Sequence, residues 1–399
     1  MSNNLVTIDM VTREALRIAH EKCQFISTTD RQYDSSFAKT GAKIGASLRV
    51  RKPNQYLRTQ GTRVMDVQEQ DEQTSTVTVA TQDHVDMRFN SAELALSLDE
   101  LSKRYIEPAV SSLVSAIEGD YLAYATKKTY NVVGTAGTAI TDLTAPGLAR
   151  ARLNQMLAPK DRNRAIQMDS VTMAGLVKGV AAYFNPSGAI SEQYREGLVA
   201  RTSMADYYEN ERVWTLTNSG DVTVTTAAAA AVTDGGTNIT LASVAAGDTT
   251  AGMTFTVAGV YACHPETKQS LGYLQPYVVI TGGATTQTVS PATILTGPRQ
   301  NVCSAASAQL ATTAYNGTAV AVTFFGAMNT SYAQSLMYHK EAFQFVTADL
   351  PLMDDAHKCV RRSQDGLSLR VWQASDIRND ELLMRIDILY GMAALRPEW

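Results

Sequence analysis

Hydrophobic and polar positions recur with different periods along this chain, and each period predicts an element. Between residues 9 and 26 the apolar positions have helical spacing, with Val11, Leu16, Ile18 and Ala19 near one face. This pattern predicts an amphipathic N-terminal helix. Such a helix either packs on its own domain or extends from it as an arm, and the residues alone leave both readings open.

Residues 45–92 are predicted to form a long β-hairpin. Apolar and polar residues alternate in Ser47–Arg51 and again in Thr74–Ala80, which is rich in β-branched side chains. The segment between these two strands is polar and contains Pro53 and Gly61. It is therefore expected to be the tip of the hairpin.

The charges of this hairpin are sorted between its two limbs. The first limb carries bases without acids and the second carries acids without bases: Arg49, Arg51, Lys52, Arg58 and Arg63, then Asp66, Glu69, Asp71 and Glu72. Pairing across one hairpin contributes about 0.2–1 kcal/mol per pair. The alternative is that the hairpin lies over a second copy of the chain and meets complementary charge there. These nine residues are the candidate contact residues.

Residues 93–130 carry the longest helical pattern, with apolar residues at steps of three and four from Leu94 to Tyr124. Lys127 and Lys128 lie near its end, as the helix dipole favours. Pro108 interrupts the pattern because proline lacks a backbone donor, and it predicts a kink or a break. A helix of this length would span roughly 45 Å.

The middle of the chain divides into two stretches of different composition. Residues 147–213 mix helical and loop-like segments, with helices expected over Gly147–Ala158 and Met173–Tyr183. Their basic residues favour a solvated or contact surface over a nucleic-acid patch, since acids interrupt them and aromatic residues do not interleave: Arg150, Arg152, Lys160, Arg162 and Arg164.

Residues 214–322 are poor in charge and rich in Thr, Val, Ala and Gly, with short alternating segments and Asp234-Gly235-Gly236 as a turn signal. They predict an all-β module, either a small barrel or a sandwich. After it, a short helix is expected over Asn329–Tyr338. Strands are expected over Gly366–Trp372 and Leu383–Tyr390.

Composition narrows the classes of protein. A chain of 399 residues suggests two or three domains, and its charged fraction of 19% is low for a soluble protein. The net charge of -4 does not indicate tight nucleic-acid binding. The chain has neither a signal-peptide pattern nor an apolar run long enough for a membrane helix, so it is expected to be made in a cytoplasm.

No catalytic motif is recognisable. The sequence lacks the phosphate-binding glycine patterns, the zinc-protease motif and the nucleophile-elbow motif. Four scattered cysteines do not form a disulfide framework, and the two pairs His20 with Cys23 and His357 with Cys359 do not have the spacing of a zinc site. We expect no catalytic residue, no metal and no cofactor.

The last sixty residues resemble the C-terminal part of P22-like coat proteins of tailed bacteriophages. The similar features are the run Tyr338–Phe345, the pairs Asp376-Ile377 and Arg385-Ile386, and the segment Tyr390–Glu398 with its Arg-Pro-Glu ending. The resemblance implies an α+β, HK97-like capsid fold with an inserted all-β domain. It divides the chain into an N-terminal arm (1–44), an E-loop hairpin (45–92), a spine helix with P-domain (93–146), an A-domain (147–213), an inserted domain (214–322) and return strands (323–399).

The function implied by this resemblance is that of a major capsid protein. It would assemble into an icosahedral shell, in hexamers and pentamers, around the double-stranded DNA of a tailed bacteriophage. The implied partners are other copies of the chain, a scaffolding protein, a portal protein, a decoration protein and the packaged DNA by proximity, without any membrane. Assembly is expected in the bacterial cytoplasm and the final place is the virion. The alternatives are an encapsulin-like compartment shell and a tail-tube or decoration protein, and an enzyme comes last.

Overall fold

The computed structural model describes most of the chain and divides it into two compact units. The described residues are 8–34, 47–62, 65, 67–68, 73–90, 102–180, 205–218, 224–225, 233–241, 244, 247–283, 285–307, 310, 320–327, 329–353, 358–376, 378–379 and 381–399. Unit 1 comprises Met1–Val50, Thr74–Leu122 and Lys340–Leu395. Unit 2 comprises Arg51–Gln73, Ala123–His339 and Arg396–Trp399.

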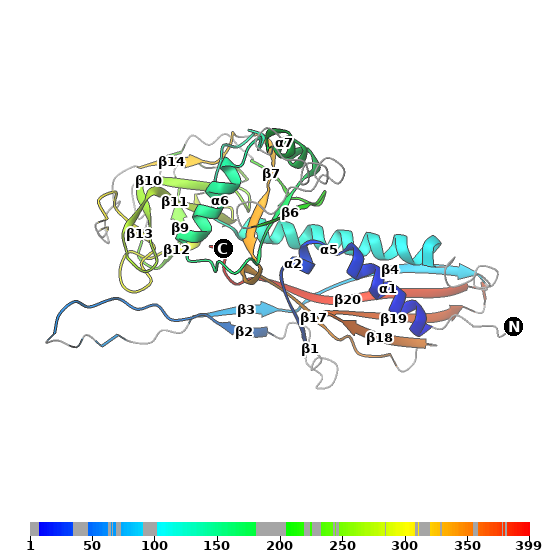
Figure 1. Cartoon of the computed structure of the whole chain (residues 1–399). Coiled ribbons are helices and arrows are strands. Elements are labelled where there is room, and N and C mark those ends of the chain that lie inside the picture. Colours follow the sequence, from blue (N-terminus) through cyan, green and yellow to red (C-terminus); the bar gives the residue numbers. More distant parts are fainter. Residues whose placement is uncertain are drawn as a thin grey trace, which may run out of the picture. The chain divides into compact units, whose positions relative to one another are not determined.

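Unit 1 is built on a six-stranded sheet whose central strand is β20 (Figure 1). The strand order is β1-β17-β20-β19-β18, and β4 pairs with the other side of β20. The strands are β1 (Asp30–Asp34), β4 (Thr81–Asn90), β17 (Phe343–Ala348), β18 (Lys358–Gln364), β19 (Leu367–Asp376) and β20 (Glu381–Ala394). The two strands predicted at 366–372 and 383–390 are confirmed.

The helices of unit 1 supply the apolar layer beside this sheet. They are α1 (Ile8–Lys22), α2 (Phe25–Thr28), the π-helical turn η2 (Ser102–Ile106), α5 (Glu107–Lys128) and the 3-10 turn η3 (Lys340–Ala342). Ala19, Val110 and Ile117 of the helices meet Leu369 and Ile388 of the sheet around one small apolar gap. The apolar stripe of α1 is buried in this way, so the predicted N-terminal helix packs on its own unit.

The long predicted helix changes from a π-helical turn to an α-helix next to Pro108, without a gap between the two. Its described part begins with η2, and α5 starts at Glu107. Pro108 therefore lies in the first turn of α5, where its missing N–H needs no partner. Residues 93–101 of the predicted helix lie outside the described part of the chain.

Unit 2 has a small three-stranded sheet with two helices near it. Its strands are β5 (Arg164–Met168), β6 (Asp206–Glu209) and β16 (Leu336–His339), in the order β16-β5-β6. The helices are α6 (Thr144–Gln155) and α7 (Ser170–Val180), close to the two predicted helices. The helix expected over Asn329–Tyr338 is wrong: Ser331–Ala333 forms β15 and Leu336–His339 forms β16, because each segment pairs with an earlier strand.

The charge-poor region folds as β-structure, as its alternation predicted. Its strands are β8 (Val224–Thr225), β9 (Gly236–Thr240), β10 (Thr254–Cys263), β11 (Ser270–Thr281), β12 (Thr286–Thr293), β13 (Val302–Cys303) and β14 (Ala321–Phe324). Among the described residues they form one sheet in the order β8-β14-β10-β11-β12-β9, with β13 beside β10. Phe255, Val257 and Tyr277 belong to its buried core. Two further strands, β7 (Thr215–Thr217) and β15, pair where the chain enters and leaves this module.

Part of the predicted hairpin joins another sheet. Only β2 (Ser47–Arg51) and β3 (Thr74–Thr78) pair with each other, whereas β4 pairs along its whole length with β20. The hairpin proper is therefore β2, β3 and the loop between them. No helix in the described part of the chain is both long enough and apolar enough to cross a membrane.

Candidate functional site

The loop between β2 and β3 is mostly exposed where the structure describes it. The backbone N–H of Lys52 donates to the carbonyl of Gln73 at 2.8 Å, which continues the strand pairing by one step. Further out, the side-chain amide of Gln68 binds the backbone of Leu57 twice: it accepts from the N–H at 2.8 Å and donates to the C=O at 2.6 Å. Figure 1 shows the two limbs running on beyond β2 and β3. The Gln68 amide thus holds the limbs together where strand pairing has ended.

Apolar side chains gather on this loop instead of in the core. Met65 is 83% exposed and Val67 is 78% exposed, and Tyr56 and Leu57 are exposed as well. Four of the eleven exposed large hydrophobic residues of the described chain thus fall within twelve residues of sequence. Grouped exposed apolar side chains are typical of contact surfaces. We call Tyr56, Leu57, Met65 and Val67 the apolar tip.

The structure places only some of the nine candidate contact residues. Arg49 and Arg51 lie in β2, and Arg58 is exposed on the loop. Lys52 is half-buried, and this burial lowers the pKa of its ammonium although the nearby Glu398 carboxylate raises it. The others lie outside the described residues: Arg63, Asp66, Glu69, Asp71 and Glu72. Whether the two charged limbs pair with each other or with a second copy stays a prediction.

Sequence reasoning missed the apolar tip. The signal was present, because an isolated Met or Val in a polar loop is unexpected unless something covers it. Arg58, by contrast, was predicted as a contact residue, and its exposure leaves it available for one.

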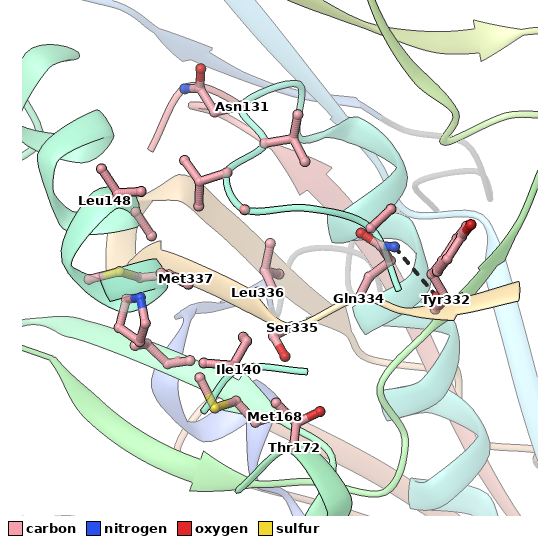
Figure 2. Close-up of a pocket in the computed structure, with 18 of the residues that line it drawn as sticks. Asn131, Ile140, Leu148, Met168, Thr172, Tyr332, Gln334, Ser335, Leu336 and Met337 are labelled. Atoms are coloured by element: carbon pink, nitrogen blue, oxygen red, sulfur yellow. Dashed lines mark hydrogen bonds between the residues drawn. The ribbon is translucent and has the colours of Figure 1, made fainter. Parts of the chain in front are cut away.

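Unit 2 also contains a cavity of about 470 Å³. Figure 2 shows apolar side chains around it, including Leu148 of α6, Met168 of β5 and Leu336 of β16. Polar side chains such as Asn131 and Gln334 join them, and the amide of Gln334 donates to the carbonyl of Tyr332 at 3.4 Å (Figure 2). The volume is in the range of small-molecule sites.

The charged groups of this cavity are occupied by structural contacts. Its charged lining residues are Asp142, Arg152 and Glu398, and neither histidine nor cysteine is among the described residues that line it. Asp142 accepts from the N–H of Thr144 at 2.9 Å at the start of α6. The Arg152 guanidinium lies 3.0 Å from the ring centre of Tyr273. The lining therefore offers apolar surface without a pair of groups arranged for acid–base or nucleophilic chemistry.

The C-terminus is fastened inside unit 2 by a cluster around Trp399. The indole N–H donates to the carbonyl of Met156 at 2.8 Å, and the carbonyl of Trp399 accepts from the N–H of His339 at 3.0 Å. The His339 and Trp399 rings meet edge-on at 5.8 Å. His339 in turn binds Asp161 at 2.9 Å. We call Met156, Asp161, His339 and Trp399 the C-terminal clasp.

The clasp perturbs the titration of one carboxyl group. Partial burial pushes the pKa of Asp161 upward, but hydrogen bonds with His339 and Asn163 outweigh it and lower the pKa to about 2. One of the predicted basic residues, Arg164, is close in sequence to Asp161. Arg164 is buried and donates to the carbonyls of Ala158 and Pro159, so it is not the solvated residue that the sequence suggested.

Comparison with known proteins distinguishes a phage coat protein from the other classes of protein that the sequence left open. The P22 coat protein family (gene protein 5) matches residues 72–399 of the chain. The chain belongs to this family. A search of curated protein sequences gave no match. The match covers the segment beyond β2 up to the last residue, so it includes the C-terminal clasp and the β module as well as the segment that carried the resemblance.

Several of the solved structures similar to this coat protein come from phages. A Mycobacterium phage Che8 chain is 8% identical with a TM-score of 0.46, covering 92% of this chain and 86% of that one. A chain of the cyanophage P-SCSP1u capsid is 10% identical with a TM-score of 0.45, covering 93% and 84%. A chain of the bacteriophage PhiM1 mature capsid is 11% identical with a TM-score of 0.41, covering 94% and 85%. The family assignment rests on the sequence match.

The predicted fold class is confirmed at its general level. The coat protein is a mixed α+β chain, and it belongs to a family of phage major capsid proteins. The encapsulin-like alternative is not favoured. Of the two sequence pairs considered for zinc, His20 binds the carbonyl of Gln364 at 3.1 Å, and His357 lies outside the described residues. Within the described part of the chain there is no cluster of three metal-ligating side chains.

Proposed function

We propose that this coat protein assembles into the hexamers and pentamers of an icosahedral shell that encloses the double-stranded DNA genome of a tailed bacteriophage. The observation that carries the proposal is the family match over residues 72–399. Burial of apolar surface at many repeated contacts would drive assembly, with each contact individually modest. Because the net charge is -4, the packaged DNA is held by enclosure and not by tight binding.

Imaging of the purified protein tests this function. Electron microscopy should show closed shells or six-fold and five-fold pieces of them. A small oligomer that stays small at high concentration, and that carries hydrolytic or redox activity, would contradict the proposal. Co-expression with a scaffolding protein should increase the fraction of closed shells, since the family implies a scaffolding partner, a portal, a decoration protein and assembly in the host cytoplasm.

We further propose that the hairpin loop forms a contact between copies of the coat protein, through both its apolar tip and its sorted charges. The exposed side chains of Met65 and Val67 support the apolar part, and the exposed Arg58 supports the charged part. The Gln68 amide bonds to Leu57 keep the loop in one shape before it meets a neighbour. A preformed loop loses less conformational freedom when it binds.

Two sets of substitutions separate the apolar and charged contributions. Met65→Ser with Val67→Ser should reduce the yield of shells and leave the monomer folded, as should Arg58→Glu with Arg63→Glu. Val171→Ser is the matched control, because Val171 is 82% exposed but lies at the start of α7. Shell yield is measured by sedimentation and folding by circular dichroism. Equal loss in the control, or no loss in either double variant, would reject the hairpin contact.

A further inference from the structure

Two cysteines lie side by side at one end of the β module. In the pairing of β10 with β13, Tyr261 is opposite Cys303 and Ala262 is opposite Val302. Side chains alternate between the faces of a strand, so Cys263 shares a face with Tyr261 and therefore with Cys303. Residues diagonally placed on one face of neighbouring strands are close enough for their side chains to interact.

The two thiols are shielded from solvent and lie against the backbone of β10. The Sγ of Cys303 donates to the carbonyl of Ala262 at 3.9 Å, and the Sγ of Cys263 donates to that of His264 at 3.9 Å. Cys263 and Cys303 are 2% and 0% exposed, and both are free thiols in this structure. The backbone around them is held by strand hydrogen bonds, including the one from Cys263 N–H to the carbonyl of Asn301 at 2.9 Å. Diagonal neighbours on paired strands have Cα atoms about 7–8 Å apart, whereas a disulfide needs about 4.4–6.8 Å. A disulfide here thus requires a change of side-chain torsions and an approach of the two paired strands by roughly 1 Å or more.

We propose that Cys263 and Cys303 are a disulfide-forming pair, which a small external disulfide converts into a covalent link between β10 and β13. The thiolate of one cysteine attacks a sulfur of the reagent and releases one reagent thiol. The second cysteine then attacks the resulting mixed disulfide on the first and releases the other reagent thiol. The protein loses two protons and two electrons, which the reagent disulfide takes up as it becomes two thiols, so the exchange is balanced.

The surroundings of the pair determine how fast this happens. Burial raises the pKa of Cys263 to about 12, with a further rise from the neighbouring Cys303, while Lys268 acts in the opposite direction. Burial also raises the pKa of Cys303. The thiolate is the reacting form. Neutral solution therefore leaves the pair reduced for long periods, and the rate of bond formation should rise about tenfold for each pH unit above neutrality.

The link would close a loop that contains the central strands of the module. Residues 264–302 lie between the two cysteines and include β11 and β12. Such a link restricts the unfolded chain and stabilises the folded one. The oxidised module should consequently unfold at a higher temperature than the reduced one. This inference concerns the chemistry of the module and holds whether or not the shell contacts are as proposed.

Peptide mapping of the full-length coat protein tests the pair directly. The folded protein is incubated with hydroxyethyl disulfide between pH 7 and pH 9, unreacted thiols are blocked in denaturant, and the protein is digested with trypsin. Cleavage after Arg212, Lys268, Arg299 and Lys340 gives peptide 213–268, with Cys263, and peptide 300–340, with Cys303. The expected product is a single linked species of these two peptides that separates on reduction, forms about tenfold faster per pH unit, and is absent from Cys263→Ala.

The controls distinguish a built pair from random oxidation. The variant with Cys23→Ala and Cys359→Ala should give the same linked species at the same rate, and its thermal midpoint should rise on oxidation and fall again with reductant. Blocked thiols at both Cys263 and Cys303 after incubation at pH 9, reagent adducts on them without a link, or links that involve Cys23 or Cys359 in the folded protein would each overturn the proposal.

Discussion

The side chain of Glu118 connects helix α5 with the start of helix α2. Its carboxylate accepts hydrogen bonds from the backbone N–H groups of Phe25 at 2.7 Å and Ile26 at 3.3 Å, and also from that of Gln24. These N–H groups have no partner within the short helix α2. Sequence alone could not show this, because Glu118 lies inside the apolar pattern of α5 and its partners are more than ninety residues earlier in the chain.

The buried ion pair of Arg370 with Asp387 is a second such point. The pair is 2.7 Å apart, its side chains are 4% and 0% exposed, and Arg385 also reaches Asp387. Removing one partner of a buried pair costs about 3–5 kcal/mol, because it leaves a buried charge uncompensated. Asp387→Asn should therefore lower the unfolding free energy of the coat protein by roughly that amount.

The matched control for this prediction lies on the same strand. Glu381 pairs with Arg88 at 3.1 Å, and the Arg88 side chain is 71% exposed. Glu381→Gln should cost about 0–1 kcal/mol, as surface pairs do. Both variants are compared by urea unfolding followed through Trp372, whose ring lies 5.6 Å from the Arg370 guanidinium. Similar losses in the two variants would contradict the argument from burial.

Asp161 gives a prediction for acid solution. Its pKa falls from the ordinary 3.8 to about 2 in the folded chain, so folding favours its charged form. The stability that it contributes is complete above pH 4 and is lost as the pH falls through about 2. The thermal midpoint of the native protein should drop more steeply between pH 4 and pH 2 than that of Asp161→Asn. Parallel curves would show that the C-terminal clasp does not depend on this carboxylate.

At the scale of the element, sequence predicted what local periodicity encodes and missed what distant pairing decides. The apolar spacing predicted α1, and the alternation predicted β10 and β19. Pro108 marked the position where α5 starts. The segment 329–338 was predicted as a helix but forms β15 and β16, which pair with β7 and β5 more than one hundred residues earlier. At the candidate site, the exposed Arg58 was found by its charge, and the apolar tip was not.

Helix α7 contacts the backbone of residues 140–141 through two glycines, Gly175 and Gly179. A Cβ on Gly179 would lie 1.4 Å from the carbonyl oxygen of Thr141, and one on Gly175 would lie 3.3 Å from that of Ile140. The glycines therefore let residues 140–141 lie directly on the helix. The small residue is required here by the close approach of the backbone, since neither glycine has a positive φ.

Two glycine substitutions in helices should have opposite effects. Gly179→Ala should destabilise unit 2, because the new methyl group would overlap the Thr141 backbone. Gly119→Ala in α5 meets nothing within 4 Å and should stabilise the helix by about 0.5–1 kcal/mol, since alanine is the better helix former. The thermal midpoints of the two variants provide the comparison. A neutral Gly179→Ala would mean that residues 140–141 move aside at little cost.

At the scale of the whole molecule, the two units differ in how the chain builds them. Unit 1 draws on three separate stretches of sequence, and its central strand β20 pairs with β4, about three hundred residues earlier. Its sheet therefore cannot be completed before the C-terminal part has been synthesised. The β module of unit 2 is continuous in sequence and has its own buried core, and its pairings join strands no more than about one hundred residues apart. Local pairings form faster than distant ones.

The β module should consequently fold when it is separated from the rest. The fragment 214–334 begins and ends at paired residues, since the N–H of Gln334 donates to the carbonyl of Trp214 at 3.0 Å. Its NMR spectrum should show dispersed amide signals, because the core of Phe255, Val257 and Tyr277 lies entirely within it. A collapsed, undispersed spectrum would show that the remainder of unit 2 is needed.

The pairing of β7 with β15 has a consequence for how the β module could be replaced by another domain during evolution. Thr217 is opposite Ser331 and Thr215 is opposite Ala333, so the chain departs and returns at neighbouring positions. Whatever lies between these two strands needs only to bring its own ends close together. A different domain with adjacent termini should therefore fit onto the same stalk, the pair β7 and β15, and such a replacement would remove the contact of Arg152 with the Tyr273 ring. The stalk marks the natural place for displaying foreign protein on this subunit.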